Sequence, residues 1–282
     1  MSKIVDVLRL TRIEHSVMLV IAVVAAEMIT KALPNWYILT LSIITPIFIS
    51  MAAFAINDYF DIEVDMENMR KRPLVKGTLK PSDALHITVV GIVIGVISSA
   101  FINVYCLIIA ILFGLLSVLY SYRLKRMLLW GNMYIAFSMS IPFIFGNFVV
   151  SSNISAGIVL VSIMIFISGV AREIHGTIRD VKGDRKRNAQ TMPIRFGTGF
   201  SAVVALILYF IAILISAYLI AFVHPFKYNV AFIIPILITD MILAFVSIGY
   251  LMRSSRGFYD LSRNLSLVAM AVALLAILVA PI

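Results

Sequence analysis

Nine long apolar segments take up most of the 282-residue chain, and they limit what it can fold into. Hydrophobic residues make up 62% of the sequence and charged residues 13%, a balance that excludes a soluble globular domain. Backbone polar groups inside lipid must bond within their own segment, so apolar segments of roughly 18–24 residues predict spanning helices. We therefore predict an all-α membrane protein with nine transmembrane helices in a bundle. The predicted spans are approximately residues 16–33, 38–60, 84–104, 106–122, 131–150, 156–178, 199–222, 229–250 and 264–281.

Positive charge is concentrated in alternate connections between these spans. The formal net charge is +9, and nearly every Lys and Arg falls in the N-terminal segment or in the connections after spans two, four, six and eight. Only Lys31 and Lys227 lie on the opposite side. This distribution predicts a multi-pass protein of the cell membrane with a cytoplasmic N-terminus and an external C-terminus. It argues against nucleic acid as a partner, because the charge follows the membrane topology.

A cluster of oxygen-bearing side chains stands at the end of the second span. Asn57, Asp61 and Asp65 are spaced four residues apart, and Asp58 precedes Asp61 by three. If the helix continues, these side chains share one face. Carboxylates this close repel one another unless a cation neutralises them, and an all-oxygen set suits Mg²⁺. We expect Asn57, Asp61 and Asp65 to bind Mg²⁺, with Asp58 as a ligand or a supporting residue and Glu63 on the solvated face.

A second acidic pair stands at the end of the sixth span. Asp180 and Asp184 are again four residues apart, and the topology places both acidic helix ends on the cytoplasmic side. Two such ends can face each other across one cavity and hold two or more Mg²⁺ ions that bridge a substrate diphosphate. Arg70, Arg72 and Lys76 follow the first cluster, where they can donate to phosphate oxygens. The alternative for each cation is a loop charge that only sets topology.

Four sequence blocks resemble one known family. They read NDYFDIEVD (residues 57–65), YSYRLKR (residues 120–126) and DVKGD (residues 180–184), the last followed by NAQTMPIRFG (residues 188–197). In this order they resemble the UbiA superfamily of intramembrane prenyltransferases. The resemblance implies a helical bundle around a central cavity and transfer of an isoprenyl group from an allylic diphosphate to a lipophilic or aromatic acceptor. Mg²⁺ and basic side chains would then stabilise the diphosphate leaving group.

The resemblance adds candidates at two further helix ends. Lys125, at the end of the fourth span, can reach the diphosphate, and Tyr120 can bond to the leaving oxygen or anchor the membrane interface. Arg12 and His15, at the entrance to the first span, are expected substrate contacts or an ordinary interfacial pair. The predicted catalytic residues are Asp61, Asp65, Asp180, Asp184, Lys125 and Tyr120. The predicted substrate-binding residues are Asn57, Asp58, Arg70, Arg72, Lys76, Arg12 and His15.

One domain is predicted for residues 1–282, since no linker of Pro, Gly and Ser divides the chain. Residues 1–15 are expected to form an amphipathic segment in the membrane interface. Residues 61–83 and 180–198 are expected to be cytoplasmic active-site loops. Cys106 is the only cysteine, which excludes an intramolecular disulfide and a cysteine-based metal site.

The run from Asn68 to Gly77, NMRKRPLVKG, indicates a subfamily. It resembles the form found in archaeal ether-lipid prenyltransferases and in chlorophyll synthases, whereas Met192 replaces the usual leucine of the later block. We predict a Mg²⁺-dependent enzyme that moves geranylgeranyl from its diphosphate to the free hydroxyl of geranylgeranylglyceryl phosphate. The alternative within the family is an aromatic quinone precursor or a tetrapyrrole as acceptor.

Two other classes of membrane protein also use intramembrane acids. A cation-coupled secondary transporter places charged residues near the bilayer midplane, and Asp240 in the eighth span fits that pattern. A CDP-alcohol phosphotransferase uses paired aspartates, but its signature needs a D-G-x-x-A-R run that this chain lacks. Glu27 and Lys31, four residues apart near the outer end of the first span, are expected to pair with each other.

Overall fold

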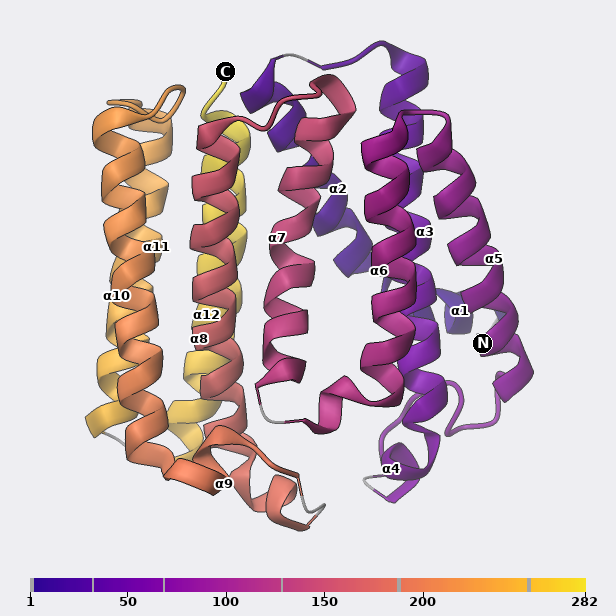
Figure 1. The fold of residues 1–282 in the computed structure, drawn as a ribbon. Helices are drawn as coiled ribbons and strands as arrows, with labels where there is room; N and C mark the ends of the chain where they lie inside the picture. The colour runs from indigo at the N-terminus through magenta and orange to yellow at the C-terminus, as the bar shows by residue number, and fades with distance from the viewer. Residues whose placement is uncertain (1–2, 32, 68, 128, 187–188, 253–254) are drawn as a thin grey trace.

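The computed structural model describes residues 3–31, 33–67, 69–127, 129–186, 189–252 and 255–282, and it is a bundle of roughly parallel and antiparallel helices (Figure 1). Within these residues, nine helices are long and apolar enough to cross a membrane. The predicted all-α membrane fold is therefore confirmed. The nine helices are α2 (Ile13–Thr30), α3 (Trp36–Phe60), α5 (Pro81–Ala100), α6 (Val104–Tyr122), α7 (Trp130–Val150), α8 (Ala156–Lys186), α10 (Thr198–Phe222), α11 (Val230–Met252) and α12 (Arg256–Val279).

Four short helices complete the described chain. They are α1 (Lys3–Thr11), α4 (Ile62–Glu67), the 3-10 helix η1 (Leu124–Arg126) and α9 (Met192–Phe196). Helix α1, in the segment expected at the membrane interface, packs against α3. Figure 1 shows α4 and α9 at the same, lower end of the bundle, so the two long polar connections lie at one end. Asn68 and Asn188, which belong to the blocks named above, lie outside the described residues.

Side-chain caps determine where several helices begin. The Asn103 carboxamide oxygen accepts a hydrogen bond from the Cys106 amide (3.0 Å) and starts α6 where the sequence divides the third and fourth spans. Ser255 accepts from the Phe258 amide (3.3 Å) and starts α12 at Arg256. The predicted ninth span began only at residue 264. The sequence prediction therefore left the polar first turns of α12 outside the helix.

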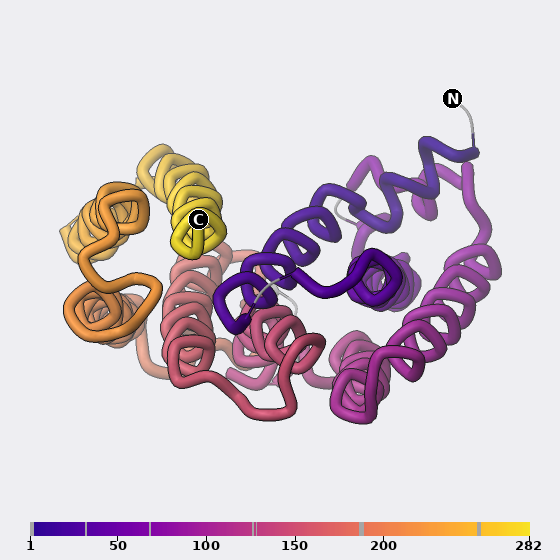
Figure 2. The backbone as a smooth tube through the Cα atoms, turned by 90° about the horizontal axis from the view of Figure 1, so that it is seen from above, coloured from indigo at the N-terminus to yellow at the C-terminus, as the bar shows by residue number. Residues whose placement is uncertain are grey.

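The spanning helices form two groups joined through α2 and α7 (Figures 1 and 2). Helices α3, α5 and α6 pack together in one group, and α8, α10, α11 and α12 form the other. Helices α2 and α7 pack closely against each other, and α2 also contacts α12. A core of buried side chains that includes Ala22, Ala26, Phe143 and Ile158 connects this central pair to the second group. The two groups thus form one bundle.

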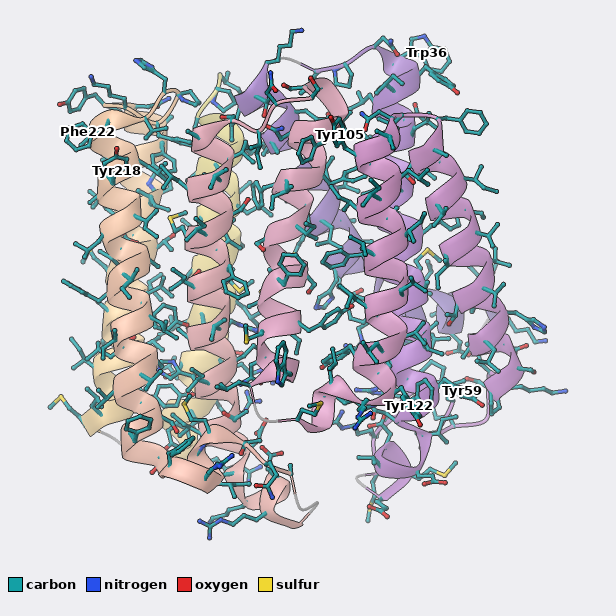
Figure 3. The ribbon with its side chains drawn as sticks, in the orientation of Figure 1. Trp36, Tyr59, Tyr105, Tyr122, Tyr218 and Phe222 are labelled. Carbon is teal, nitrogen blue, oxygen red and sulfur yellow. The ribbon has the colours of Figure 1, made fainter. Side chains whose placement is uncertain are left out.

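Aromatic side chains mark both ends of the bundle (Figure 3). Trp36, Tyr105, Tyr218 and Phe222 lie at the upper end, and all four are exposed. Tyr122 and Tyr59 lie at the lower end. Such aromatic rings favour the two interfaces of a membrane, while exposed Leu, Ile and Val side chains between them face lipid. This arrangement fits a multi-pass membrane protein.

The pairing expected for Glu27 is wrong. Its side chain is fully buried near Ser42 of α3, and it forms no ion pair with Lys31. Lys31 is exposed at the C-terminal end of α2, and its backbone amide donates a hydrogen bond to the Glu27 carbonyl (3.1 Å). The four-residue spacing alone could not show that the Glu27 side chain lies on the side of α2 that faces the bundle interior.

Close contact between α2 and α7 depends on Gly146. A Cβ atom at this position would lie 2.4 Å from the Val23 carbonyl oxygen and 2.9 Å from the Ala26 Cβ. We expect Gly146→Val to force the two helices apart and lower the free energy of unfolding by about 1–3 kcal/mol. A lower thermal unfolding midpoint in detergent would show this. Gly199→Ala is the control, because nothing lies within 4 Å of its added Cβ; equal midpoints for both variants would contradict the prediction.

Candidate active site

The first acidic cluster lies where α3 ends. The single helix expected through this motif is interrupted at Asp61, whose φ of −99° and ψ of 2° separate α3 from α4. Backbone hydrogen bonds nevertheless continue across the break, from the Asp61 amide to the Asn57 carbonyl (3.1 Å) and from the Asp65 amide to the Asp61 carbonyl (2.8 Å). The register of Asn57, Asp61 and Asp65 is therefore close to that of a continuous helix.

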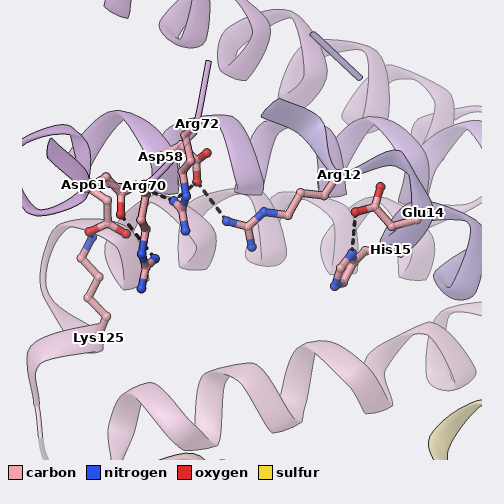
Figure 4. Close-up of polar contacts among 9 residues, drawn as sticks. Arg12, Glu14, His15, Asp58, Asp61, Arg70, Arg72 and Lys125 are labelled. Carbon is pink, nitrogen blue, oxygen red and sulfur yellow. Dashed lines mark hydrogen bonds and ion pairs between the residues drawn. The ribbon is translucent and has the colours of Figure 1, made fainter. Parts of the chain in front are cut away.

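Arg72 connects two buried carboxylates of this cluster (Figure 4). Its Nη1 atom lies 2.5 Å from Asp58 Oδ1 and 2.7 Å from Asp65 Oδ2. Arg12 also pairs with Asp58 (3.0 Å), and Arg70 pairs with Asp65 (3.3 Å). Because the Asp58 and Asp65 side chains are only 3% and 2% exposed, these cations provide the opposite charge that two buried carboxylates need.

Lys125 brings the end of the fourth span to the same cluster. Its Nζ atom lies 2.6 Å from Asp61 Oδ1, so the short helix η1 is held beside the end of α3 (Figure 4). Tyr120, in the last turn of α6, stacks on Tyr134 of α7 with 4.4 Å between ring centroids. Tyr120 also interacts electrostatically with Asp61 and with Glu173 of α8. The structure thus brings both candidates of the fourth span toward the first cluster.

Arg12 and His15 form polar contacts with different residues. Arg12 has a left-handed backbone (φ 46°, ψ 57°) that turns the chain between α1 and α2 and directs its side chain toward Asp58. Its guanidinium also lies over the Phe54 ring, 4.7 Å from the centroid. His15 instead faces Glu14 (3.6 Å) and meets the same Phe54 ring edge-on. Arg12 therefore belongs to the first cluster, and His15 lies next to it.

The second acidic pair lies on an uninterrupted helix. Helix α8 continues to Lys186, so Asp180 and Asp184 do share one face, and the first part of the expected 180–198 loop is helical. Arg179 makes a bidentate pair with Asp180, with N–O distances of 2.8 and 2.7 Å. Further into the bundle, Arg172 pairs with Glu173 (3.0 Å).

A polar cavity of about 1200 Å³ lies beside the second acidic pair and extends to Arg70, which pairs with Asp65 of the first cluster. It is lined by the polar end of α8, including Asp180 and Asp184, by residues of α10, α11 and α12, and by Arg70 from the connection after α4. Arg70 therefore borders both the first cluster, through Asp65, and the cavity around the second. Lys76, in contrast, is exposed and takes part in no ion pair among the residues that the structure describes.

Comparison with known proteins supports the family resemblance that the sequence blocks indicated. The sequence model of the UbiA prenyltransferase family matches residues 18–268. A digeranylgeranylglyceryl phosphate synthase of Archaeoglobus fulgidus is 33% identical over 267 residues, which cover 94% of this chain and 91% of that protein. The chain belongs to the UbiA prenyltransferase family. It is accordingly an intramembrane prenyltransferase, and the family assignment decides against the transporter and the phosphotransferase.

Further relatives and solved structures also resemble this UbiA chain. A digeranylgeranylglyceryl phosphate synthase of Pyrococcus furiosus is 30% identical over 233 residues, covering 82% of this chain and 81% of the relative. A solved structure from work on digeranylgeranylglyceryl phosphate synthase in membranes has a TM-score of 0.82 at 26% identity and covers 100% of this chain and 99% of that one. A UbiA homologue from Archaeoglobus fulgidus bound to GPP and Mg²⁺ shares the fold (TM-score 0.65, 18% identity), with 96% of this chain and 99% of that chain covered.

Sequence reasoning missed two sets of cavity residues in this UbiA chain. Arg256, Asp260 and Arg263 line the polar cavity from α12, in turns that the prediction assigned to a loop. Their spacing of four and three residues, after the Ser255 cap, was the available signal. His175 of α8 also lines the cavity, stacked on Tyr250 at 3.9 Å. Nothing in the local sequence marked that contact between α8 and α11.

The donor atoms of the first cluster fit Mg²⁺. Asn57, Asp61 and Asp65 offer only oxygen ligands, and Asp65 Oδ2 lies 2.7 Å from Arg72 without the geometry of a hydrogen bond. No three His, Cys, Asp or Glu side chains within the described ranges converge on one point. Mg²⁺ does not require such a cage, because it is commonly held by one or two carboxylates together with substrate phosphates and water.

We expect Arg72→Gln to destabilise the UbiA fold, because the variant leaves Asp58 and Asp65 buried with one cation fewer. Removing one partner of a buried ion pair costs about 3–5 kcal/mol. The thermal unfolding midpoint in detergent measures the loss, and Lys76→Gln should leave it unchanged because Lys76 is exposed. Adding Asp58→Asn to Arg72→Gln should recover part of the loss. Strictly additive effects would show that the two side chains are not coupled.

Proposed function

We propose that this chain transfers a geranylgeranyl group from geranylgeranyl diphosphate to the free hydroxyl of geranylgeranylglyceryl phosphate, with Mg²⁺ as cofactor. The observation that carries the proposal is the common polar cavity. Arg70 of the first connection lines it together with Asp180 and Asp184 of α8. Carboxylates that can bind metal ions therefore border one space with cations that can bind phosphate oxygens, and Arg70 brings one of these cations from the first half of the chain.

The proposal assigns the diphosphate to the region between the two acidic helix ends. Asp61 and Asp65, with Asn57, would hold Mg²⁺ on one side, and Asp180 and Asp184 on the other. When bound, Mg²⁺ neutralises the charge that develops on the departing diphosphate as the allylic C–O bond breaks.

The cations of the first cluster have a second role in this proposal. Arg70, Arg72 and Lys125 now pair with acids, and they are near enough to those acids to be shared with phosphate oxygens. Asp58, held by Arg12 and Arg72, acts as a positioning residue that orients Arg72 toward the site. Lys76 and His15 remain candidates for substrate contact, and Tyr120 for a bond to the leaving oxygen.

The names of the relatives support the choice of substrates. Several relatives that are similar in sequence over much of the chain are named digeranylgeranylglyceryl phosphate synthase. The structure described as bound to GPP and Mg²⁺ has the same fold. The distribution of Lys and Arg supports a cytoplasmic site, with the N-terminus on that side and the C-terminus outside.

Replacing one aspartate in either cluster should stop the reaction. We expect Asp61→Asn and Asp184→Asn each to lower kcat at least about 100-fold, because each removes a charge from the site that stabilises the departing diphosphate. Prenyl transfer by the purified protein measures this, and size-exclusion elution as for the wild type would show that the variants are folded. Normal turnover in either variant would contradict the proposal that both acidic clusters take part in the reaction.

Two controls belong to this experiment. Glu63→Gln removes an acid from the same motif, but Glu63 is exposed on α4, so activity should stay near the wild-type level. EDTA should stop turnover by the wild type, and added Mg²⁺ should restore it. Full activity in EDTA would rule out the proposed cofactor.

The acceptor can be tested directly with geranylgeranyl diphosphate as donor. We expect product with geranylgeranylglyceryl phosphate and none with 4-hydroxybenzoate or a chlorophyllide, because the polar cavity carries more cationic than acidic side chains and suits a phosphorylated acceptor. Mass spectrometry of the extracted lipids identifies the product. Transfer only to the aromatic acid or the tetrapyrrole would replace the proposed acceptor while leaving prenyl transfer intact.

A further inference from the structure

Helix α12 presents a cationic face to the polar cavity. Arg256, Asp260 and Arg263 are spaced four and three residues apart, so they lie on one side of the helix, and all three line the cavity. Asp260 interacts electrostatically with Arg179 of α8. Neither Arg256 nor Arg263 forms an ion pair within the part of the chain that the structure describes, and no motif assigns a role to either.

Unpartnered polar groups mark the inner end of the same cavity. Both ring nitrogens of His175, the Tyr209 hydroxyl and the Arg172 Nε atom are buried and have no hydrogen-bond partner among the described residues. His175 is 4% exposed and Tyr209 1%, and both line the cavity. Buried polar groups in folded proteins are nearly always bonded to protein, water or a ligand. These atoms therefore indicate that a polar group binds at this level of the bundle.

The polar cavity continues into an apolar one. A second cavity of about 140 Å³ lies between α2, α7, α8, α10, α11 and α12, and its lining is mostly Met, Leu, Ile, Phe and Ala. Arg172, Tyr209 and Ser266 line both spaces. A ligand that fits both has an anionic head among the Arg side chains and an apolar chain in the second cavity.

Charge balance separates this ligand from the donor diphosphate. Six Arg and Lys side chains and four Asp and Glu side chains of the described residues line the polar cavity. Two of the acids, Asp180 and Asp184, belong to the proposed Mg²⁺–diphosphate site on α8. Arg256 and Arg263 line the cavity from a different helix, α12, and neither forms an ion pair with those acids within the described residues, so they are available to bind a second anion.

From these observations we infer that Arg256 and Arg263 of α12 form the binding site for the phosphate monoester of the lipid acceptor. The inference rests on the proposed function for the identity of that lipid. His175 and Tyr209 lie further in, at the level where the polar part of the acceptor gives way to its chain. Donor and acceptor head groups then bind to different helices around one cavity, the donor between the acidic helix ends and the acceptor on α12.

The test is binding of geranylgeranylglyceryl phosphate to the full-length protein in detergent, without donor and without Mg²⁺, measured by calorimetry. The double variant Arg256→Gln with Arg263→Gln should raise Kd at least about tenfold, because it removes charge-assisted bonds to the phosphate. The double variant with Lys at both positions should stay within about threefold of the wild type, because it keeps the charge. Geranylgeranylglycerol, which lacks the phosphate, should bind equally weakly to all three proteins.

Arg195→Gln is the matched control, since it removes an exposed arginine at the same end of the bundle, on α9, and Arg195 lines neither cavity. It should bind the lipid as the wild type does. An unchanged Kd in the Gln double variant, no binding by the wild type, or equal binding of the two lipids would overturn the inference. Turnover is measured separately: a wild type that binds the phosphorylated lipid in this way but does not prenylate it would sink the proposed function and leave the phosphate site standing.

Discussion

The contact of Arg72 with Asp58 and Asp65 is the interaction on which the polar end of this bundle depends. Two carboxylates are buried at the end of α3 and in α4, where an uncompensated charge would cost several kcal/mol. Arg72 lies between them, Arg12 reaches Asp58 from the start of α2, and Lys125 reaches the neighbouring Asp61 from η1. The acids thus hold together the ends of three spanning helices and the connection after α4.

This network of ion pairs also explains how the end of a membrane helix can bind a highly charged substrate. Each acid of the first cluster already has a cationic partner, so the cluster is close to electrically balanced by itself. In the proposed reaction a diphosphate enters with Mg²⁺, and the positive charge of Mg²⁺ largely offsets the negative charge of the diphosphate. The Arg and Lys side chains can then be shared between carboxylate and phosphate without leaving a buried charge unpaired.

The sequence predicted those parts of the structure that depend on local periodicity. Apolar run lengths located the nine spans, and the four-residue spacing of Asp180 and Asp184 placed both on one face of α8. The features that it missed depend on distant partners or on backbone detail. The pairing of Asp58 with Arg12 joins residues 46 positions apart, the break at Asp61 is a local distortion inside a strong helical pattern, and the burial of Glu27 depends on which side of α2 meets its neighbours.

Helix α8 determines where the reacting atoms can meet in the proposed reaction. Its polar end borders the large cavity, and Arg172, further into the bundle, lines both that cavity and the apolar one. The allylic carbon of the donor is bonded directly to the diphosphate, and the acceptor hydroxyl lies a few bonds from its phosphate. If both head groups bind in the polar cavity, the two reacting atoms are held near its inner end, while both chains extend toward apolar surroundings. Fixing the two anionic head groups is therefore enough to bring the reacting atoms together. The acids and arginines at the polar end of the bundle are suited to hold those head groups.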